Sequence, residues 1–307
     1  MRDFWQKVDK TLRYHGKHAA FGLRGWWWDI RHLKVERPIF VVGCSRAGTT
    51  LVYKTLSESR EIGTLHRETH DFWARLHPLQ EKNWETHALS DDDASDYDRD
   101  YVARYYYSRT GKTRFVDKNN QNGLCVPYLC ALFPDAHFVY VKRNPGDNLN
   151  SLIEGWRRPE EFATWSRDLP ARVAIDDGKY KSWCFFLAEG WQQFLNAHIE
   201  DVCTFQYDAI NQAILDAKSA IPDQQWHEVF YEDLVRDPVG QFRSMFTACG
   251  LGFDERMERH CNNVLSLPYN AFSAIRVDKW RDGRNDDRIR RVFPKLEKVA
   301  KLMGYTD

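Results

Sequence analysis

The sequence predicts an α/β fold, a single P-loop-like domain in which helices flank a central parallel sheet. Short apolar runs followed by a turn, and then by apolar residues at helical spacing, recur along the 307 residues. The first of these units, at residues 38–51, holds Gly43 and Gly48 at the spacing of a phosphate-binding loop. No internal repeat or low-complexity linker interrupts the chain. We therefore expect one domain over residues 35–307, preceded by a basic, tryptophan-rich arm at residues 1–34.

Composition narrows the class of protein. The 44 basic and 44 acidic residues balance, so no excess of positive charge favours nucleic acid as a partner. The seven cysteines are scattered and form no CxxC or Cys/His cluster in the sequence, which disfavours a zinc site and a disulfide framework. No apolar run reaches about 18 residues, and the N-terminus has no signal-peptide core. We expect a cytoplasmic protein.

The arm at residues 1–34 is basic and amphipathic. It holds eight Lys/Arg against three Asp, and Phe4, Val8 and Leu12 repeat every four residues ahead of Trp26, Trp27 and Trp28. A basic amphipathic helix with clustered tryptophans is suited to an anionic membrane surface. Packing of its aromatic side chains on the domain is the alternative. Residues 1–34 are therefore a candidate for peripheral membrane contact.

The unit at residues 38–51 predicts an anion site. A helix N-terminus presents unpaired N–H groups and the positive end of the helix dipole, and glycines let the backbone approach a phosphate. The residue after Gly48 is Thr49, whereas nucleoside triphosphatases have a lysine there, and the cation inside the loop is Arg46. A guanidinium is suited to gripping a terminal oxyanion. We expect a ligand other than a magnesium–ATP complex.

Ionisable groups follow the next two predicted strands. A short strand near residues 62–65 is followed by four candidates for a general base, and residues 114–119 indicate a buried strand that ends in Lys118. The carboxyl ends of parallel strands face one crevice, so these groups are expected beside the loop. The four candidates are His66, Glu68, His70 and Asp71.

A second strand-to-helix turn repeats this arrangement. Residues 136–145 contain the clearest later strand, which ends in Arg143, and a helix that begins near Asp147 carries Ser151. An arginine and a hydroxyl thus flank another turn. One phosphate loop and a separate Arg/Ser pair together predict a ligand with two anionic groups.

Later segments are expected to complete the crevice. Residues 155–181 mix Pro, Gly and charge and are predicted to form a mobile lid or a substrate wall, and residues 183–194 a core helix. Residues 227–234 indicate a strand that continues into a helix after Pro238, and a final helix is expected from about Asp286 to near Gly304. Between them lies a predicted loop that contains Ser273, Arg276, Lys279, Trp280 and Arg281.

From about residue 38 to 305 the set of motifs resembles the sulfotransferase family that uses 3′-phosphoadenosine 5′-phosphosulfate (PAPS). Residues 42–51 resemble the family's 5′-phosphosulfate loop, and residues 133–151, with a serine eight residues after an arginine, resemble its 3′-phosphate motif. Residues 231–234 and 279–280 resemble later segments. The loop arginine makes the chain more similar to the bacterial and Golgi-type branch, and Glu68-Thr69 and Lys118 are similar to residues of tyrosylprotein sulfotransferases.

The resemblance implies transfer of a sulfuryl group from PAPS to an acceptor hydroxyl without a metal, with adenosine 3′,5′-bisphosphate (PAP) as the product. Glu68 is then the expected general base, with a pKa raised by the closed crevice. Arg46 and Lys118 are expected to neutralise charge on the transferring group. The residues expected to bind the donor are Arg46, Ala47, Gly48, Thr49, Thr50, Leu51, Arg143, Ser151, Tyr231, Ser273, Lys279 and Trp280.

The acceptor stays open at this point. Cys44 and Ala47 depart from the commoner Pro-Arg-Ser-Gly form of the loop, and His70 stands where tyrosylprotein sulfotransferases have an arginine. The breadth of the family favours a carbohydrate or glycolipid hydroxyl in a bacterial, cytoplasmic enzyme, with a tyrosyl or phenol hydroxyl as the alternative. Two other classes compete with this reading: a P-loop nucleotide kinase, and a non-enzymatic nucleotide-binding protein of the membrane surface.

Overall fold

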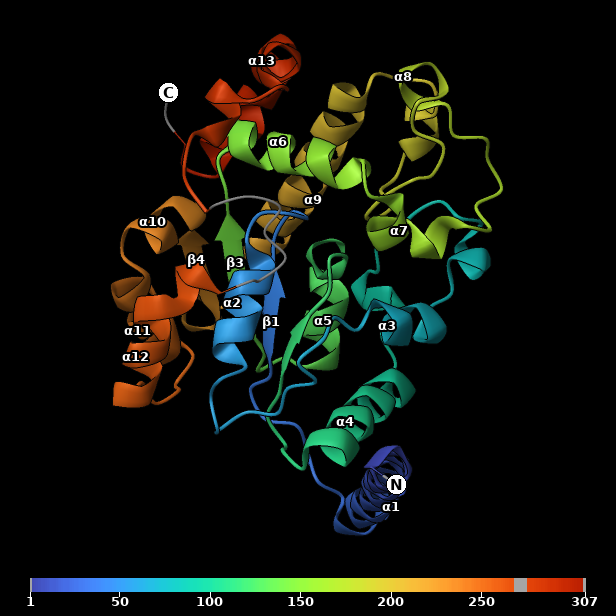
Figure 1. Ribbon diagram of the computed structural model, residues 1–307, viewed down its shortest axis with the longest axis vertical. Coiled ribbons are helices and arrows are strands. Elements are labelled where there is room, and N and C mark those ends of the chain that lie inside the picture. The colour runs from blue at the N-terminus through green and yellow to red at the C-terminus, as the bar shows by residue number, and fades with distance from the viewer. Residues whose placement is uncertain (1, 268–274, 306–307) are drawn as a thin grey trace.

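The computed structural model describes residues 2–267 and 275–305, with side chains described from residue 18 onward (Figure 1). Within these residues the centre of the molecule is a four-stranded sheet with strand order β2-β1-β3-β4, and every neighbouring pair is parallel. The predicted α/β fold with a central parallel sheet flanked by helices is confirmed. The strands are β1 (Ile39–Val42), β2 (Val116–Lys118), β3 (His137–Lys142) and β4 (Trp226–Phe230).

Helices cover both faces of the sheet (Figure 1). Alternate residues of β1 enter different cores, since Ile39 and Val41 belong to one apolar cluster and Phe40 and Val42 to the other. The core around Val41 includes side chains from α2 (Thr49–Leu56), α10 (Tyr231–Arg236), α11 (Pro238–Ala248) and α12 (Glu255–Asn263).

The larger core, around Phe40, is rich in aromatic side chains. The helix predicted to begin near Asp147 is present as α6, and the side chain of Asn144 accepts a hydrogen bond from the Asp147 amide at its first turn. The expected C-terminal helix is present as α13. The helices on this side are α3 (His70–Leu76), α4 (Asp96–Thr110), α5 (Val126–Leu132), α6 (Pro145–Trp156), α7 (Pro159–Phe162), α8 (Ile175–Gly178), α9 (Ile199–Lys218) and α13 (Asp286–Leu302).

The strand expected near residues 62–65 is reduced to one bridge, between Gly63 and Phe115. The Thr64 hydroxyl accepts a hydrogen bond from the His66 amide, 3.1 Å away, and His66 has a φ of 54°. This local side-chain bond turns the backbone before a ladder can continue. The general-base candidates therefore follow a bridge and a turn.

The helix expected at residues 183–194 was wrong. These residues form a buried irregular segment that ends in a short 3₁₀ turn at Trp191–Phe194. Phe185 has a φ of 71°, and side chains from elsewhere bind the carbonyls of the segment: Gln206, on α9, donates to the carbonyls of Cys184 and Phe186. Tertiary hydrogen bonds thus replace the helical ones. The aromatic side chains of Trp183, Phe185, Phe186 and Trp191 are nevertheless buried, as expected, whereas Phe194 is only partly buried.

Helix α1 (Arg2–Arg31) packs on α4 at the end of the molecule where the strands begin (Figure 1). Asp29 pairs with Arg104, with 2.9 Å between Oδ1 and Nε, and the rings of Trp28 and Tyr107 lie 5.2 Å apart. In the described part of the chain no helix combines the length and the apolar character needed to cross a bilayer. The division into an arm and a domain near residue 34 stays a prediction.

Candidate active site

The loop between β1 and α2 approaches its neighbours so closely that two positions require glycine. A Cβ added at Gly43 would lie 2.6 Å from the carbonyl oxygen of Val141, and one at Gly48 would lie 2.4 Å from the ring of Tyr231. Gly48 also has a φ of 105°, which favours glycine. These contacts set the loop against the carboxyl end of β3 and the start of α10, and Tyr231 forms one wall of the pocket.

The first turn of α2 faces this pocket. Thr49, Thr50 and Leu51 line it together with Arg46 and Gly48. The amides at the start of an α-helix have no acceptor within the helix, so they are available to an anion. Ala47 differs from the prediction, since it is buried away from the pocket lining and its amide donates to the carbonyl of Cys44 at 3.0 Å.

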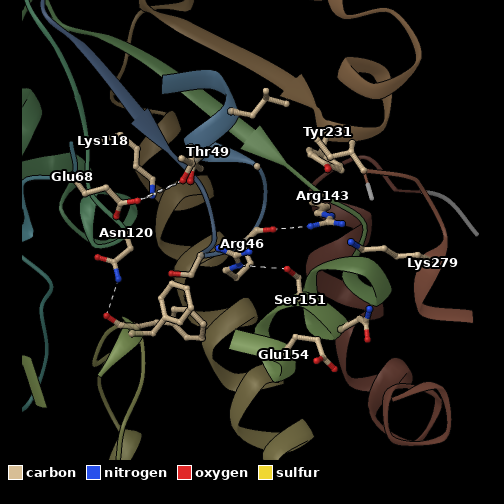
Figure 2. Close-up of a pocket in the computed structure, with 18 residues that line it drawn as sticks. Arg46, Thr49, Glu68, Lys118, Asn120, Arg143, Ser151, Glu154, Tyr231 and Lys279 are labelled. Atoms are coloured by element: carbon tan, nitrogen blue, oxygen red, sulfur yellow. Dashed lines mark hydrogen bonds and ion pairs between the residues drawn. The ribbon is translucent and has the colours of Figure 1, made fainter. Parts of the chain in front are cut away.

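Arg143 and Ser151 lie on the other side of the loop (Figure 2). The Nη1 of Arg143 donates to the carbonyl of Arg46 at 2.8 Å, and its guanidinium lies 4.3 Å from the centre of the Tyr231 ring. Its Nε and Nη2 are buried and have no hydrogen-bond partner among the described residues. Buried donors of a charged group are normally satisfied, so these two nitrogens indicate a place for an anionic ligand.

Positive charge gathers around this point. The Nε of Arg46 lies 3.4 Å from the hydroxyl of Ser151, and burial, with Arg143 adding repulsion, lowers the pKa of Arg46 to about 10. Burial and then the charge of Arg143 lower the pKa of Lys279, which also lines the pocket. The charge of Arg143 thus contributes to the lowered pKa of both Arg46 and Lys279, and an anion between these cations would stabilise all three. Their arrangement favours a ligand with more than one negative group.

Glu68 and Lys118 form an ion pair on the opposite side of the pocket (Figure 2). Their Oε1 and Nζ atoms are 2.6 Å apart, and the hydroxyl of Thr50 lies 3.5 Å from the former and 3.4 Å from the latter. The expected rise in the pKa of Glu68 was wrong. Burial does oppose the carboxylate, but Lys118, followed by His70 and Arg46, outweighs it and lowers the pKa of Glu68.

The other three general-base candidates do not line the pocket. His66 and His70 are exposed, and Asp71 is paired with Arg67 across 2.8 Å on the surface. Glu68 is therefore the one of the four that the fold brings to the loop, Lys118 and Arg46.

Residues 38–255 match the family model described as "Sulfotransferase family". The chain belongs to this family. The predicted family is confirmed, and the match covers the loop, the Glu68–Lys118 pair, Arg143, Ser151 and Tyr231, although Lys279 of the pocket lies beyond it.

Individual relatives are distant. Half of this chain, 152 residues, is 21% identical to omega-hydroxy-beta-dihydromenaquinone-9 sulfotransferase Stf3 of Mycobacterium tuberculosis, and the match covers 32% of that protein, about a third of its length. Sulfotransferase STF9 from Mycobacterium avium has a similar fold, with a TM-score of 0.52 and 15% identity over 92% of this chain and 84% of that one. A sulfotransferase from Alicyclobacillus acidocaldarius gives a TM-score of 0.50 and 17% identity, over 89% and 98% of the two chains.

In this sulfotransferase-family chain the pocket has an aromatic wall that sequence reasoning missed. Phe162, at the end of α7, and Phe185 have ring centres 5.0 Å apart, and the Arg46 guanidinium lies 5.4 Å from the Phe162 ring. Phe162 comes from the segment predicted to form a lid or wall, and it lines the pocket. Phe185 reaches the pocket only because its segment is irregular, so no local sequence pattern predicted that it lines the pocket.

Asn120 is a second pocket residue that was not predicted. Its Nδ2 donates to the carbonyl of Phe185 at 2.8 Å, whereas its Oδ1 is buried without a hydrogen-bond partner in the described ranges. The side chain lies between Glu68 and the aromatic wall (Figure 2). Its position two residues after Lys118, at the same strand end, was the available sequence signal.

Three further residues, in the C-terminal part of the chain, were predicted to bind the sulfuryl donor PAPS: Ser273, Lys279 and Trp280. Trp280 is buried outside the pocket lining, where a Cβ added at Gly146 would lie 2.4 Å from its ring. The carboxylate of Asp147 accepts from the amides of Asp278 and Trp280, at 2.7 and 3.2 Å, and so holds Lys279 at the pocket. Ser273 lies outside the described residues.

Proposed function

We propose that this chain transfers a sulfuryl group from PAPS to an acceptor hydroxyl. The observation that carries the proposal is the pair of buried, unpartnered nitrogens of Arg143, set across the loop from the first turn of α2. The 5′-phosphosulfate fits the amides of Thr49, Thr50 and Leu51, and the 3′-phosphate fits Arg143 and Ser151. A ligand with two separated anionic groups uses both places at once.

In the proposed reaction the acceptor oxygen attacks sulfur in line with the bond to the 5′-phosphate. As the new O–S bond forms, the bond from sulfur to the bridging oxygen breaks, and PAP departs with the electron pair. Glu68 takes the hydroxyl proton, and its lowered pKa keeps it in the carboxylate form that a base requires. Lys118 and Arg46 neutralise the charge that builds on the bridging oxygen and the transferring group.

The acceptor we propose is a carbohydrate or glycolipid hydroxyl. Phe162 and Phe185 offer aromatic surface to the C–H face of a sugar ring, and the Oδ1 of Asn120 is an acceptor for a second hydroxyl. A tyrosyl or phenol hydroxyl is the alternative, since the same wall accommodates an aromatic ring. The nucleotide kinase hypothesis is less favoured, because Thr49 stands where a kinase loop has its lysine and the cation of this loop is Arg46.

Calorimetric titration with PAP, with and without EDTA, tests the donor site. We expect binding that EDTA does not change and that Arg143→Ala weakens by at least about tenfold, as for loss of a charged hydrogen bond. Arg236→Ala is the matched control, because this exposed arginine of α10 lies outside the pocket. Binding of magnesium–ATP in place of PAP would overturn the proposal and restore the kinase hypothesis.

A further inference from the structure

Four of the seven large hydrophobic side chains that are exposed among the described residues lie on α1. Leu23 is 68% exposed, Trp26 60%, Trp27 40% and Ile30 50%. The spacing of three, four and seven residues from Leu23 places all four on one face of the helix. We call these four residues the α1 stripe. Two neighbouring tryptophans left this open to water are unusual on a surface that has no partner.

The stripe faces away from the domain. The opposite side of α1 holds α4 through the Asp29–Arg104 ion pair, the contact between Trp28 and Tyr107, and a hydrogen bond from Arg24 to the carbonyl of Arg109. Trp28, which follows the two exposed tryptophans, is buried. The helix is therefore already anchored by one face, and the α1 stripe contributes nothing to that anchor.

Charge decides which partner fits this face. The guanidinium of Arg31 lies 4.6 Å from the centre of the Trp27 ring, and Lys34 follows it closely in the sequence. Residues 1–34 hold eight Lys/Arg against three Asp, so a second copy of the helix would face it with the same excess of positive charge. An anionic lipid surface complements that charge, and tryptophan is the side chain suited to the boundary between headgroups and acyl chains.

We propose that α1 lies in the headgroup region of an anionic membrane, with the α1 stripe inserted. This assignment stands on the helix and is independent of the chemistry at the pocket. Because α1 lies where the strands begin and the pocket lies at their carboxyl ends, the docked protein turns the pocket toward water (Figure 1). If the proposed sulfuryl transfer is correct, the acceptor hydroxyl then arrives from the aqueous side, which favours the carbohydrate over a glycolipid of the same bilayer.

Vesicle flotation of the full chain tests the docking. Vesicles of phosphatidylcholine are compared with vesicles that also contain phosphatidylglycerol, for the wild type, Trp26→Ser/Trp27→Ser, and Leu302→Ser. Leu302 is the matched control, because it is 54% exposed on α13, away from α1. We expect flotation with the anionic vesicles that salt weakens, a loss of about tenfold or more in the double variant, and no change in the control.

Equal flotation of the wild type and the double variant, or none with either vesicle, would overturn the proposal. Sedimentation equilibrium supplies a further check: a concentration-dependent dimer that the double variant loses would mean that a second copy covers the stripe. Circular dichroism of each variant verifies folding without reference to the pocket. A chain that floats but does not bind PAP would leave the docking intact and refute only the proposed function.

Discussion

Thr69 donates a hydrogen bond to the buried carboxylate of Asp117 across 2.5 Å. Their chain neighbours, Glu68 and Lys118, are the two members of the pocket ion pair. Asp117 also accepts hydrogen bonds from Tyr106, Trp73 and Asn122, so its carboxylate is fixed from several elements at once. The Thr69–Asp117 bond thus ties the segment after the Gly63 bridge to the end of β2 and sets the spacing of the pair.

The first prediction concerns Thr69 as a positioning residue. Thr69→Ala should lower kcat for sulfuryl transfer by about tenfold or more, because small displacements of a catalytic group are costly, while PAP affinity stays near that of the wild type. Thr69→Ser keeps the hydroxyl and should restore most of the rate. A drop in PAP affinity that matches the drop in kcat would contradict a role limited to placing Glu68.

Glu68 itself gives the second prediction. Glu68→Gln should bind PAP normally and lose about 10² to 10⁴ of its turnover, the range for loss of a general base. The pKa of Glu68 is lowered from its ordinary value of 4.5, so Glu68 is still mostly a carboxylate when the pH falls to 4.5. The acid limb of kcat/KM that Glu68 causes should therefore lie below pH 4.5. Near-normal turnover of the variant would move the role to His66, His70 or Asp71.

The third prediction concerns Asn120, which lines the pocket and whose Oδ1 is buried without a partner in the described part of the chain. Asn120→Leu should raise KM for a sugar acceptor by about tenfold, the cost of one lost hydrogen bond, and leave PAP affinity unchanged. The effect should shrink for an acceptor that lacks the neighbouring hydroxyl. An equal effect on both acceptors would show that Asn120 only supports the Phe185 segment.

Much of this architecture was predictable because its signals are local. The apolar runs of β1 and β3, the glycines of the loop and the turn before α6 each act on neighbouring residues, so the sheet, the loop and the Arg143–Ser151 arrangement follow from short patterns. That the loop after β1 lies near Tyr231, the residue after β4, was also predictable, since the carboxyl ends of parallel strands lie at the same side of a sheet.

What the sequence did not reveal depends on partners far along the chain. Residues 183–194 have the composition of a core helix, but Gln206 and Asn120 bind their carbonyls and Phe185 adopts a positive φ. The pKa of Glu68 follows the same rule, because its direction was set by how close Lys118 comes, not by burial alone. Asp117 looked like an ordinary strand residue until its four hydrogen bonds were placed.

The fourth prediction concerns two histidines at the amino ends of the strands, on the side of the sheet away from the pocket. His137 begins β3, and His227 is the second residue of β4. Arg37 donates to the Nε2 of His137, 3.0 Å from its Nη2, which leaves the proton on Nδ1 to bond His227 at 2.9 Å. Burial, followed by His227, Arg37 and Arg114, lowers the pKa of His137 from 6.5 to about 4. A second proton on His137 would have to bind at Nε2, where it would point at the positively charged guanidinium of Arg37.

The native state therefore binds this proton more weakly than the unfolded chain does. The stability that the neutral His137 contributes is complete above pH 6.5 and is lost as the pH falls from 6.5 to about 4, by at most about 1.4 kcal/mol for each pH unit. Urea unfolding at several pH values measures the slope. His137→Gln keeps an acceptor for Arg37 and a donor for His227 without titrating, so its unfolding free energy should depend less on pH in this range. Parallel pH profiles for the two proteins would show that the unfolded chain and the native state bind this proton equally well.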